Sequence, residues 1–393
     1  MTTRPLPEQF RLFAQGAARD GATTYDVICR GIADDPEILA LLGEAPVAQR
    51  RPNLLLAAVH FLLLGGATGA LADHYDTVRS LAGREEAPPG AVADLVGDFK
   101  DFVMVHRAEL LALIAVRSTQ TNEVGRCTAL FPALGAIAAG YPEGQPLWLL
   151  DLGTSAGLNL LFDSYAYTYR QRSDGAILEA GRRGAIVHLE CAVRGELGDL
   201  PPMVLPPIAG RTGIDALPID PTSEDGAHWL LACLWPDNLP RFDRLRSALA
   251  TARSTADPPT VYRGDIIDAL PGVVEGIDTD GPLVVFHSWV AAYLSPERQT
   301  QLVETVRALA RTRPLHYLYA EAPIETPGLP TPPSPSPSST SHLVTAVVHA
   351  PPDGSPPLRL ADMHHHGKWL HWWPTAKDPK GRHAGPAPGP PRR

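Results

Sequence analysis

The stretch Trp148–Leu161, WLLDLGTSAGLNLL, carries the clearest structural signal in the chain. It begins with an apolar run that ends in Asp151, passes through small residues, and becomes apolar again. Gly153 and Gly157 remove side chains where the backbone would approach a ligand. A helix starting within Ser155–Leu158 would offer free N–H groups at the same place. The stretch therefore predicts a strand, a ligand-binding turn and a helix, with Asp151 beneath the ligand.

The hydrophobic pattern differs on the two sides of this stretch. Residues 1–145 carry apolar side chains at helical spacing, as in Asn53–Leu64. Beyond them, short apolar runs such as Leu283–His287 alternate with helical patterns such as Ser295–Arg311. This alternation predicts a mainly parallel sheet with helices on both faces. We expect an all-α cap domain first and an α/β domain at residues 146–374.

Two Pro-rich segments are predicted to lack regular structure. Thr326–Ser341, TPGLPTPPSPSPSSTS, is typical of a loop between the last strands. Residues 375–393 are rich in Pro, Gly and basic residues, which predicts a disordered tail. Between these segments, His342–Ala350 and Leu358–Trp373 are predicted to form an antiparallel pair of strands.

Composition and charge exclude some classes of function. The 393 residues contain 34 Lys and Arg against 43 Asp and Glu, which gives a net charge of −9. A surface this acidic, without a long basic run, argues against nucleic acid as a partner. The N-terminus, MTTRPLPEQF, lacks an apolar signal core, so we expect a cytoplasmic protein. The uncharged Leu54–Ala72 is long enough for a membrane span, but His60 and three glycines favour a buried core helix.

The glycine turn, Gly153–Gly157, resembles the first motif of the class I S-adenosylmethionine-dependent methyltransferases. In that family an acid precedes the glycines, and the methionine part of the cofactor lies over the turn. The resemblance implies a Rossmann-like methyltransferase fold and S-adenosylmethionine as the cofactor. The dinucleotide fingerprint G-x-G-x-x-G is not met, because three residues separate the glycines, and this disfavours NAD. The resemblance assigns five residues to cofactor binding: Asp151, Gly153, Ser155, Gly157 and Asn159.

The same turn also reads G-x-S-x-G, the nucleophile-elbow pattern of the α/β hydrolases. Ser155 would then be the nucleophile, with Asp265 or Asp268 and His287 completing a triad. The helical pattern before residue 146 and the lack of an HGGG-type oxyanion sequence count against this alternative. A turn with a purely structural role is the third interpretation.

The segment RTGIDALP, residues 211–218, is similar to the G-x-D-x-x-P form of the methyltransferases' second strand. The similarity implies that Asp215 holds the ribose hydroxyls of the cofactor. Residues 163–208 would then be an insertion, and Glu190 is the alternative acid. An Asp in a solvated turn is the structural interpretation of the same residues.

Gly264, Asp265 and Ile266 follow a short apolar run and resemble the third station of the family, beside the adenine ring. The Asp265 carboxylate would accept a hydrogen bond from the exocyclic amine, and Ile266 would pack on the ring. A Gly-Asp pair alone is a weak signal, and its order after the other two stations strengthens it.

His287 ends the run Leu283–His287, which resembles the fourth strand, where cofactor and substrate meet. An imidazole there could contact the cofactor and act as a general base. Trp289 and Tyr293 would shape the acceptor pocket and stabilise a methyl-cation-like centre by cation–π attraction. The alternative is a structural histidine that is hydrogen-bonded at the strand end.

The run Thr119–Arg126, TQTNEVGR, is polar and lies between two apolar helical patterns. Such a run is either a solvated turn or a hydrogen-bonded network around a ligand. We favour the ligand, which would be a polar substrate or the amino-acid end of the cofactor. Glu123 is also a candidate catalytic residue. The predicted substrate-binding residues are Gln120, Asn122, Glu123 and Arg126.

A histidine-rich segment lies close to the C-terminus. His364 and His366 would share one face of a strand, with His371 nearby, and two imidazoles can chelate a metal. A third and a fourth ligand are not evident. We therefore expect surface histidines and no metal site.

The whole chain also resembles a bacterial family of unknown function that joins a helical N-terminal region to a methyltransferase-like half. The matching pieces lie within residues 5–373 and include Arg51–Leu56 and Trp235–Asp237. We expect methyl transfer from S-adenosylmethionine to O or N of a small molecule, with specialised metabolism as one setting, and no nucleic-acid or membrane partner. The alternatives are S-adenosylmethionine chemistry without an acceptor, such as internal alkyl transfer or elimination, and a non-catalytic cofactor-binding protein. The oligomeric state is not specified.

Overall fold

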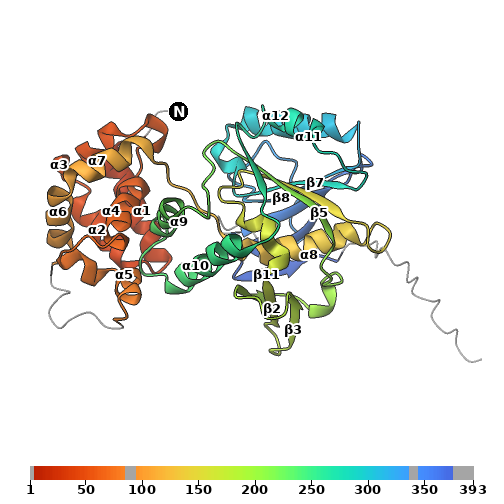
Figure 1. The fold of residues 1–393 in the computed structure, drawn as a ribbon, viewed down its shortest axis with the longest axis horizontal. Helices are drawn as coiled ribbons and strands as arrows, with labels where there is room; N and C mark the ends of the chain where they lie inside the picture. The colour runs from red at the N-terminus through yellow and green to blue at the C-terminus, as the bar shows by residue number, and fades with distance from the viewer. Residues whose placement is uncertain (1–3, 85–93, 336–343, 375–393) are drawn as a thin grey trace, which may run out of the picture. The chain divides into compact units, whose positions relative to one another are not determined.

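The structure is a computed structural model that describes residues 4–84, 94–335 and 344–374 (Figure 1). The chain forms two compact units. The helical unit contains Met1–Asn122 and Ile219–Arg253, and the sheet unit contains Glu123–Pro218 and Ser254–Arg393. The predicted boundary between residues 145 and 146 does not coincide with these units, because a helix before it packs on the sheet and two helices beyond it join the helical unit.

Proline and capping residues mark several helix starts in the helical unit. Asp35, for example, accepts hydrogen bonds from the N–H groups of Glu37 and Ile38 and caps the helix that begins with Pro36. The α-helices of this unit are α1 (Leu6–Arg19), α2 (Thr23–Ile32), α3 (Pro36–Ala40), α4 (Pro52–Leu64), α5 (Asp76–Leu81), α6 (Leu95–Val105), α7 (Arg107–Val116), α9 (Glu224–Ala232) and α10 (Leu239–Ser254).

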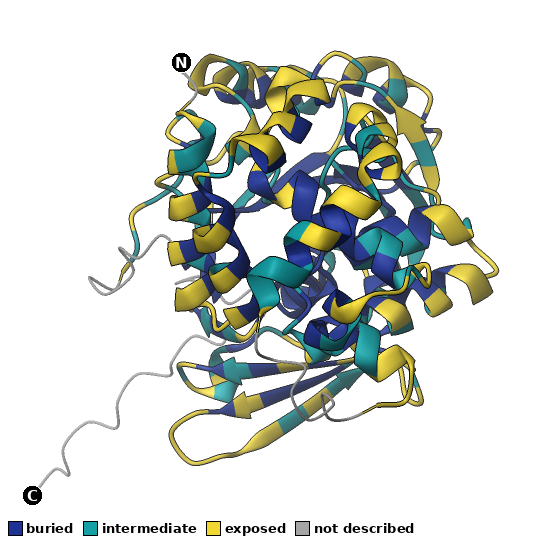
Figure 2. Cartoon of the chain, turned by 90° about the vertical axis from the view of Figure 1, so that its left-hand side faces the viewer, coloured by how far each residue is buried: buried dark blue, intermediate teal, exposed yellow. Residues whose placement is uncertain are grey.

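Helix α4 is mostly buried and packs on α1, α5, α7 and α9, which confirms the predicted core helix. The fully buried His60 lies within it, with Nδ1 3.1 Å from the carbonyl oxygens of Ala232 and Leu234 and Nε2 2.7 Å from Thr77 Oγ1. Figure 2 shows how the helices turn buried faces inward and exposed faces outward. Over residues 4–84, 94–335 and 344–374, no helix combines the length and apolar character that crossing a membrane requires.

The sheet unit holds one sheet of eleven strands among the described residues, most of them joined by parallel pairings. Its α-helices are α8 (Cys127–Ala138), which packs on the sheet, α11 (Leu270–Glu275) and α12 (Pro296–Ala310). The strands are β1 (Leu147–Leu152), β2 (Ala166–Gln171), β3 (Ile177–Gly181), β4 (His188–Val193), β5 (Ile208–Asp215), β6 (Thr260–Arg263), β7 (Leu283–Ser288), β8 (Leu315–Glu321), β9 (Val344–Ala350), β10 (Leu358–His364) and β11 (Trp369–Trp372).

The strand order is β3-β2-β4-β11-β10-β9-β8-β7-β1-β5-β6. Strands β6, β5, β1, β7 and β8 form one parallel block. Strands β2, β4 and β11 form a second parallel block. Because β8–β9, β9–β10 and β10–β11 are antiparallel pairs, the two blocks run in opposite directions. Their carboxyl ends therefore lie at opposite edges of the sheet.

The segment after the glycine turn and the C-terminal strands differ from the prediction. The predicted α-helix is the 3-10 helix η5 (Leu158–Ser164), which is interrupted at Leu161 and leads directly into β2. The predicted single strand Leu358–Trp373 is two strands, β10 and β11, because the chain reverses at Gly367, where φ is +74°. The first part of the Pro-rich loop, residues 326–335, contains no helix or strand. The rest of that loop and the predicted tail 375–393 lie outside the described residues.

Candidate functional site

The glycine turn directly follows β1, as predicted. Gly153, Ser155 and Gly157 have φ of +70°, +55° and +73°. A serine with positive φ is uncommon, and such positions cluster at functional turns. The N–H of Ser155 donates to Oδ2 of Asp215 at 2.8 Å. This bond holds the turn against the end of the neighbouring strand β5.

Protein atoms fill the space beside one of the two glycines. A Cβ atom at Gly153 would lie 2.5 Å from Cγ2 of Val290, in the loop after β7. A Cβ atom at Gly157 would meet Pro259 at an ordinary distance of 3.5 Å. Gly153 therefore serves the close packing of two loops, and the predicted ligand space above it is not there. At Gly157 a Cβ atom would fit, and the positive φ is what favours glycine there.

Asp151 lies in the core beneath the turn and is 3% exposed. Its Oδ2 accepts a hydrogen bond from the Thr154 hydroxyl at 2.9 Å. Burial raises the pKa of Asp151 to about 8, and the nearby charge of Asp215 adds to this increase. The hydrogen bond from Thr154 and the charge of Arg126 lower the pKa but do not offset the burial. The carboxyl group is therefore mostly protonated at neutral pH and ties the turn to β1.

Asp215 ends β5 beside the glycine turn, where the sequence placed it. Besides the Ser155 N–H, its carboxylate accepts the Leu217 N–H at Oδ1, at 2.8 Å. A carboxylate has about four acceptor positions, so these two bonds leave capacity for a ligand. Leu217 is 45% exposed and offers an apolar surface close by. Glu190, the alternative acid, lies on β4 in the other parallel block.

Asp265 follows β6, the strand beside β5. The Gly264 N–H donates to the carbonyl of Asp215 at 2.9 Å and joins these two stations. Burial alone would raise the pKa of Asp265, but the N–H groups of Ile267 and Asp268 and the guanidinium of Arg298 lower it overall. The carboxylate is exposed and charged.

Ile266 does not suit its predicted role beside an adenine ring. It is 7% exposed and belongs to the hydrophobic core of the sheet unit. Asn159 is similarly buried, at 4% exposure, and its side-chain oxygen lies 3.4 Å from the Cys127 thiol. Both side chains serve packing inside the unit.

His287 lies on β7 and is fully buried. Its Nδ1 lies 2.7 Å from Oε1 of Glu321, and its Nε2 lies 2.7 Å from the Tyr317 hydroxyl. Since a carboxylate only accepts, Nδ1 carries the proton and Nε2 accepts the tyrosine O–H. Neither ring nitrogen is left for a substrate, so this position does not suit the predicted general base. The alternative of a structural histidine fits the observed contacts.

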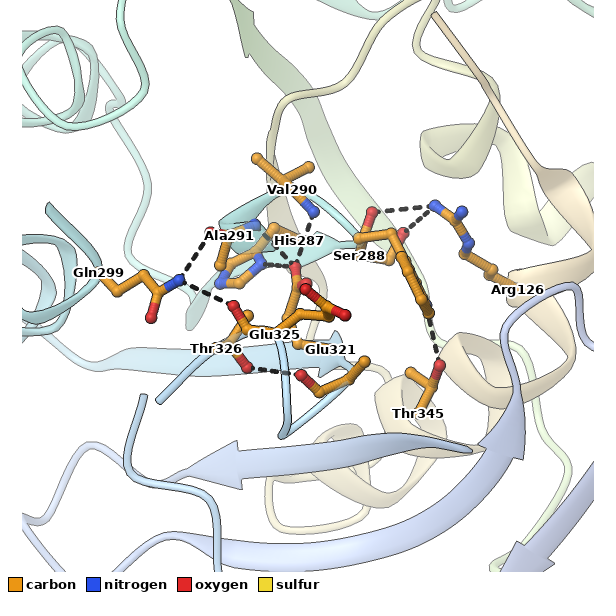
Figure 3. A network of polar contacts seen from close by, with 12 residues as sticks. Arg126, His287, Ser288, Val290, Ala291, Gln299, Glu321, Glu325, Thr326 and Thr345 are labelled. Carbon is orange, nitrogen blue, oxygen red and sulfur yellow. Dashed lines mark hydrogen bonds and ion pairs between the residues drawn. The ribbon is translucent and has the colours of Figure 1, made fainter. Parts of the chain in front are cut away.

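Glu321 organises the loop after β7 (Figure 3). Besides His287, its Oε1 accepts the N–H groups of Val290 and Ala291 at 2.8 and 3.1 Å. Its Oε2 is buried and has no hydrogen-bond partner among the described residues. Gln299 ties the same loop to the one after β8 by donating to the carbonyls of Ala291 and Glu325. Side-chain contacts therefore close the carboxyl ends of β7 and β8.

Trp289 and Tyr293 do not enclose a pocket together. Trp289 has a φ of +55°, and its indole N–H donates to Thr345 Oγ1 at 2.8 Å. The guanidinium of Arg126 lies 5.9 Å from the centre of its ring. Tyr293 is 70% exposed. The tryptophan is a packing residue at the end of β7, and the tyrosine is a surface residue.

The four predicted substrate residues are divided between the units. Gln120 and Asn122 belong to the helical unit, and Glu123 and Arg126 belong to the sheet unit. Arg126 is 7% exposed and donates to the carbonyls of Ser288 and His365, both at 3.0 Å. Glu123 accepts the Gly125 N–H at 3.0 Å. The two sheet-unit residues therefore bond to protein groups, and their predicted role in binding a ligand stays a prediction.

The contacts of His287 also separate the members of the predicted serine triad. Both of its ring nitrogens are used by Glu321 and Tyr317, so neither is left for Ser155. Asp265 instead pairs with Arg298 at 2.6 Å. The turn shares with a nucleophile elbow its sequence, its place after a strand and the positive φ of Ser155, but the partners of a triad are not assembled around it.

The imidazole rings of the histidine-rich segment pack against one another, stacked for His364 and His365 and tilted for His365 and His366. His364 and His365 have ring centres 4.2 Å apart, and His365 and His366 have ring centres 3.8 Å apart. In the part of the chain that the structure describes, no three His, Cys, Asp or Glu side chains are grouped to hold a metal ion.

Sequence reasoning missed Glu321, the residue that accepts most hydrogen bonds at this edge. The signal was present, because an acid ends the apolar run Leu315–Glu321 in the way that Asp151 ends the apolar run after Pro146. Without the strand order, nothing identified β8 as the neighbour of β7.

Comparisons with known proteins assign most of the chain to one family. No curated protein matches it. A family model described as "Uncharacterized protein conserved in bacteria (DUF2332)" matches residues 7–372, which include both units. This chain therefore belongs to the DUF2332 family.

Proposed function

We propose that the sheet unit is a Rossmann-like domain that binds S-adenosylmethionine at the carboxyl ends of β1, β5 and β6. We further propose that it transfers the methyl group to O or N of a small molecule. One observation carries the proposal. The glycine turn, Asp215 and Asp265 follow three neighbouring parallel strands, at one edge of the sheet.

The strand order supports this choice of site. The first parallel block is arranged β6-β5-β1-β7-β8. If its five strands are renumbered 1 to 5 along the chain, this order is 3-2-1-4-5, which is the order of the doubly wound nucleotide-binding folds. In those folds ligands bind outside the carboxyl ends of the strands, where the order reverses, here between β1 and β7. Side chains close the β7 side, so the proposed site extends from β1 toward β5 and β6.

The residues at this edge fit a nucleoside. The free acceptor positions of Asp215 suit ribose hydroxyls, and the exposed Leu217 suits one face of a base. Asp265 is exposed and can accept from an exocyclic amine. Neither glycine of the turn offers open space for the ligand, because Val290 lies against Gly153 and Pro259 lies against Gly157.

S-adenosylmethionine supplies a methyl group that its sulfonium already activates. The protein's task is then to position an acceptor atom in line with that group, which can provide most of the rate enhancement. A general base is not required for an acceptor that is already nucleophilic. The engaged ring nitrogens of His287 agree with chemistry that proceeds without a histidine base.

Calorimetry with S-adenosylmethionine and S-adenosylhomocysteine tests the proposal. We expect both to bind the full chain, and we expect Asp215→Asn to weaken binding at least about tenfold, or ~1.4 kcal/mol. Asp268→Asn is the matched control, because Asp268 is an exposed partner of Arg298 and has no proposed ligand contact. Its affinity should stay within about twofold. If neither compound binds the wild-type chain, the proposal is wrong.

Turnover separates the enzyme from a non-catalytic binding protein. We expect S-adenosylhomocysteine to appear when the chain, S-adenosylmethionine and a panel of small amines and phenols are incubated together. Binding without release of S-adenosylhomocysteine across the panel would contradict methyl transfer to these acceptors and favour a binding protein.

A further inference from the structure

A cavity of about 610 Å³ lies in the sheet unit, on the second parallel block. Its lining includes Arg172, Arg194, Trp369, His371 and Trp373. Four strands separate β11 from β1 in the sheet, and the two blocks run in opposite directions. The cavity is therefore distinct from the proposed cofactor site.

The strand register places basic side chains in one row. Gln171 pairs with Val193, and Val193 pairs with Leu370, on the neighbouring strands β2, β4 and β11. The ladder continues by one residue, because the N–H of Arg172 donates to Val193 O at 3.0 Å and that of Arg194 donates to Leu370 O at 2.8 Å. Arg172, Arg194 and His371 are therefore neighbours on one face, at the ~4.8 Å spacing of adjacent strands. We call these three residues the basic row.

The two arginines of the basic row have no ion pair or side-chain hydrogen bond within residues 4–84, 94–335 and 344–374. Like charges directly opposite each other on adjacent strands destabilise a sheet. Burial and the charge of Arg172 lower the pKa of Arg194. This is expected for two nearby positive charges that have no acidic partner between them. Elsewhere in this unit arginines do form ion pairs with acids, for example Arg298 with Asp265 and Arg359 with Asp362. Among the described residues, Arg172 and Arg194 do not.

The acids around the cavity are engaged elsewhere. Asp362 is opposite His371, but it accepts Arg359 Nε at 2.7 Å and the Ser334 hydroxyl at 2.7 Å. Glu196 accepts the Gln171 amide at 2.9 Å. Asp199 accepts the Glu196 N–H at 3.2 Å. None of these three acids accepts a hydrogen bond from Arg172 or Arg194, so the donors of both guanidinium groups remain available to a ligand.

Aromatic rings complete the cavity. The Arg194 guanidinium lies 3.5 Å from the centre of the Trp369 ring, so stacking fixes its plane and leaves its N–H edge for a ligand. His371 and Trp373 stack at 3.9 Å. The indole N–H of Trp373 is buried beside the cavity, so Trp373 contributes its ring to the cavity wall.

We propose that this cavity binds a small organic anion, with a carboxylate or phosphate group between Arg172 and Arg194 and a flat ring against the tryptophans. The two guanidinium groups are donors, and carboxylate and phosphate oxygens are the acceptors that arginine prefers. The site takes a ligand separate from the nucleoside cofactor and does not depend on the proposed methyl transfer.

Calorimetry with phenyl phosphate, benzoate and inorganic phosphate tests this site in the full chain. We expect at least one of the two ring-bearing anions to bind with a dissociation constant of about 1 mM or tighter, and inorganic phosphate to bind at least about tenfold more weakly than phenyl phosphate. Whichever ring-bearing probe binds more tightly identifies the anionic group. Both arginines are exposed, so glutamine variants should fold, which thermal melting monitored by circular dichroism verifies.

Arg194→Gln and Arg172→Gln should each weaken the better probe about tenfold or more, and Trp373→Phe should weaken it by a smaller factor. Arg183→Gln is the matched control, because Arg183 is an exposed arginine in the turn between β3 and β4, outside the cavity. Its affinity should stay within about twofold. The proposal would be overturned if neither ring-bearing probe binds, or if the Arg172 and Arg194 variants bind the better probe as tightly as the wild type does. Equal affinity for phenyl phosphate and inorganic phosphate would overturn the role of the ring. S-adenosylmethionine binding by Arg194→Gln serves as the independent readout of the other site.

Discussion

Charged side chains have protein partners at the carboxyl edge of the first parallel block, whereas the arginines in the basic row of the second block have none among the described residues. At the carboxyl ends of β7 and β8, Oε1 of Glu321 accepts backbone N–H groups, and Arg126 donates to backbone carbonyls. In the basic row, Arg172 and Arg194 face each other without an acidic partner in the part of the chain that the structure describes. Matched groups fix the path of the backbone, whereas unmatched charges call for a ligand. The difference predicts that changes at the edge cost stability and changes in the row cost binding.

Replacing Glu321 with alanine should have the largest effect on stability. The change removes the acceptor for His287, Val290 and Ala291 in a fully buried position. Leaving a buried donor without its acceptor typically costs about 1–3 kcal/mol, and three donors lose their acceptor here. Urea denaturation at neutral pH measures the free energy of unfolding.

Glu321→Gln is the control for this effect. Its amide oxygen keeps one acceptor at the place of Oε1, so the loss should be clearly smaller than for alanine. If Glu321→Ala unfolds at the same urea concentration as the wild type, the edge does not depend on this side chain.

Asp151→Asn should change the pH dependence of stability. The folded state holds the Asp151 proton up to a pKa of about 8, whereas an unfolded Asp releases it near pH 3.9. Between these values the folded state binds more protons, so rising pH costs the wild type up to ~1.4 kcal/mol per unit. Asparagine does not titrate, and its Oδ1 can still accept the Thr154 hydroxyl.

We therefore expect Asp151→Asn to gain stability relative to the wild type between pH 5.5 and 7.5, by at most ~2.7 kcal/mol over this range. Urea denaturation of both proteins at the two pH values measures the change. Parallel pH profiles would show that Asp151 is ionised in the folded state.

The sequence predicted the first block of the sheet well, because its signals are local. An apolar run, an acid and two glycines mark β1 and its turn, and Asp215 and Asp265 follow neighbouring strands in the expected order. The helix after the turn was wrong because Leu158–Ser164 has apolar residues that suit either a helix or a compact 3-10 segment. Propensity does not distinguish these, and the early entry into β2 imposes the tighter form.

The basic row could not be predicted from the sequence. Arg172 and Arg194 are 22 residues apart, and His371 follows far along the chain, so only the register of β2, β4 and β11 brings them together. The same reason explains why His287 was interpreted as a base. Its partners Tyr317 and Glu321 come from the next parallel strand, and only pairing with that strand shows that both ring nitrogens are engaged.

The smallest expected effect concerns the stability of Arg194→Gln. Loss of stacking on Trp369 costs ~0.5–1 kcal/mol at an exposed site, and relief of repulsion from Arg172 offsets it, so the net change should be within about 0.5 kcal/mol. Because removing any arginine makes this acidic chain more negative, Arg183→Gln provides the reference for overall charge. The difference in melting temperature, Arg194→Gln minus Arg183→Gln, should be more positive at 50 mM than at 500 mM NaCl, since salt screens the local repulsion.

A loss of ~2 kcal/mol in Arg194→Gln at both salt concentrations would mean that Arg194 stabilises the sheet as the edge residues do, and the contrast between the two regions would fail.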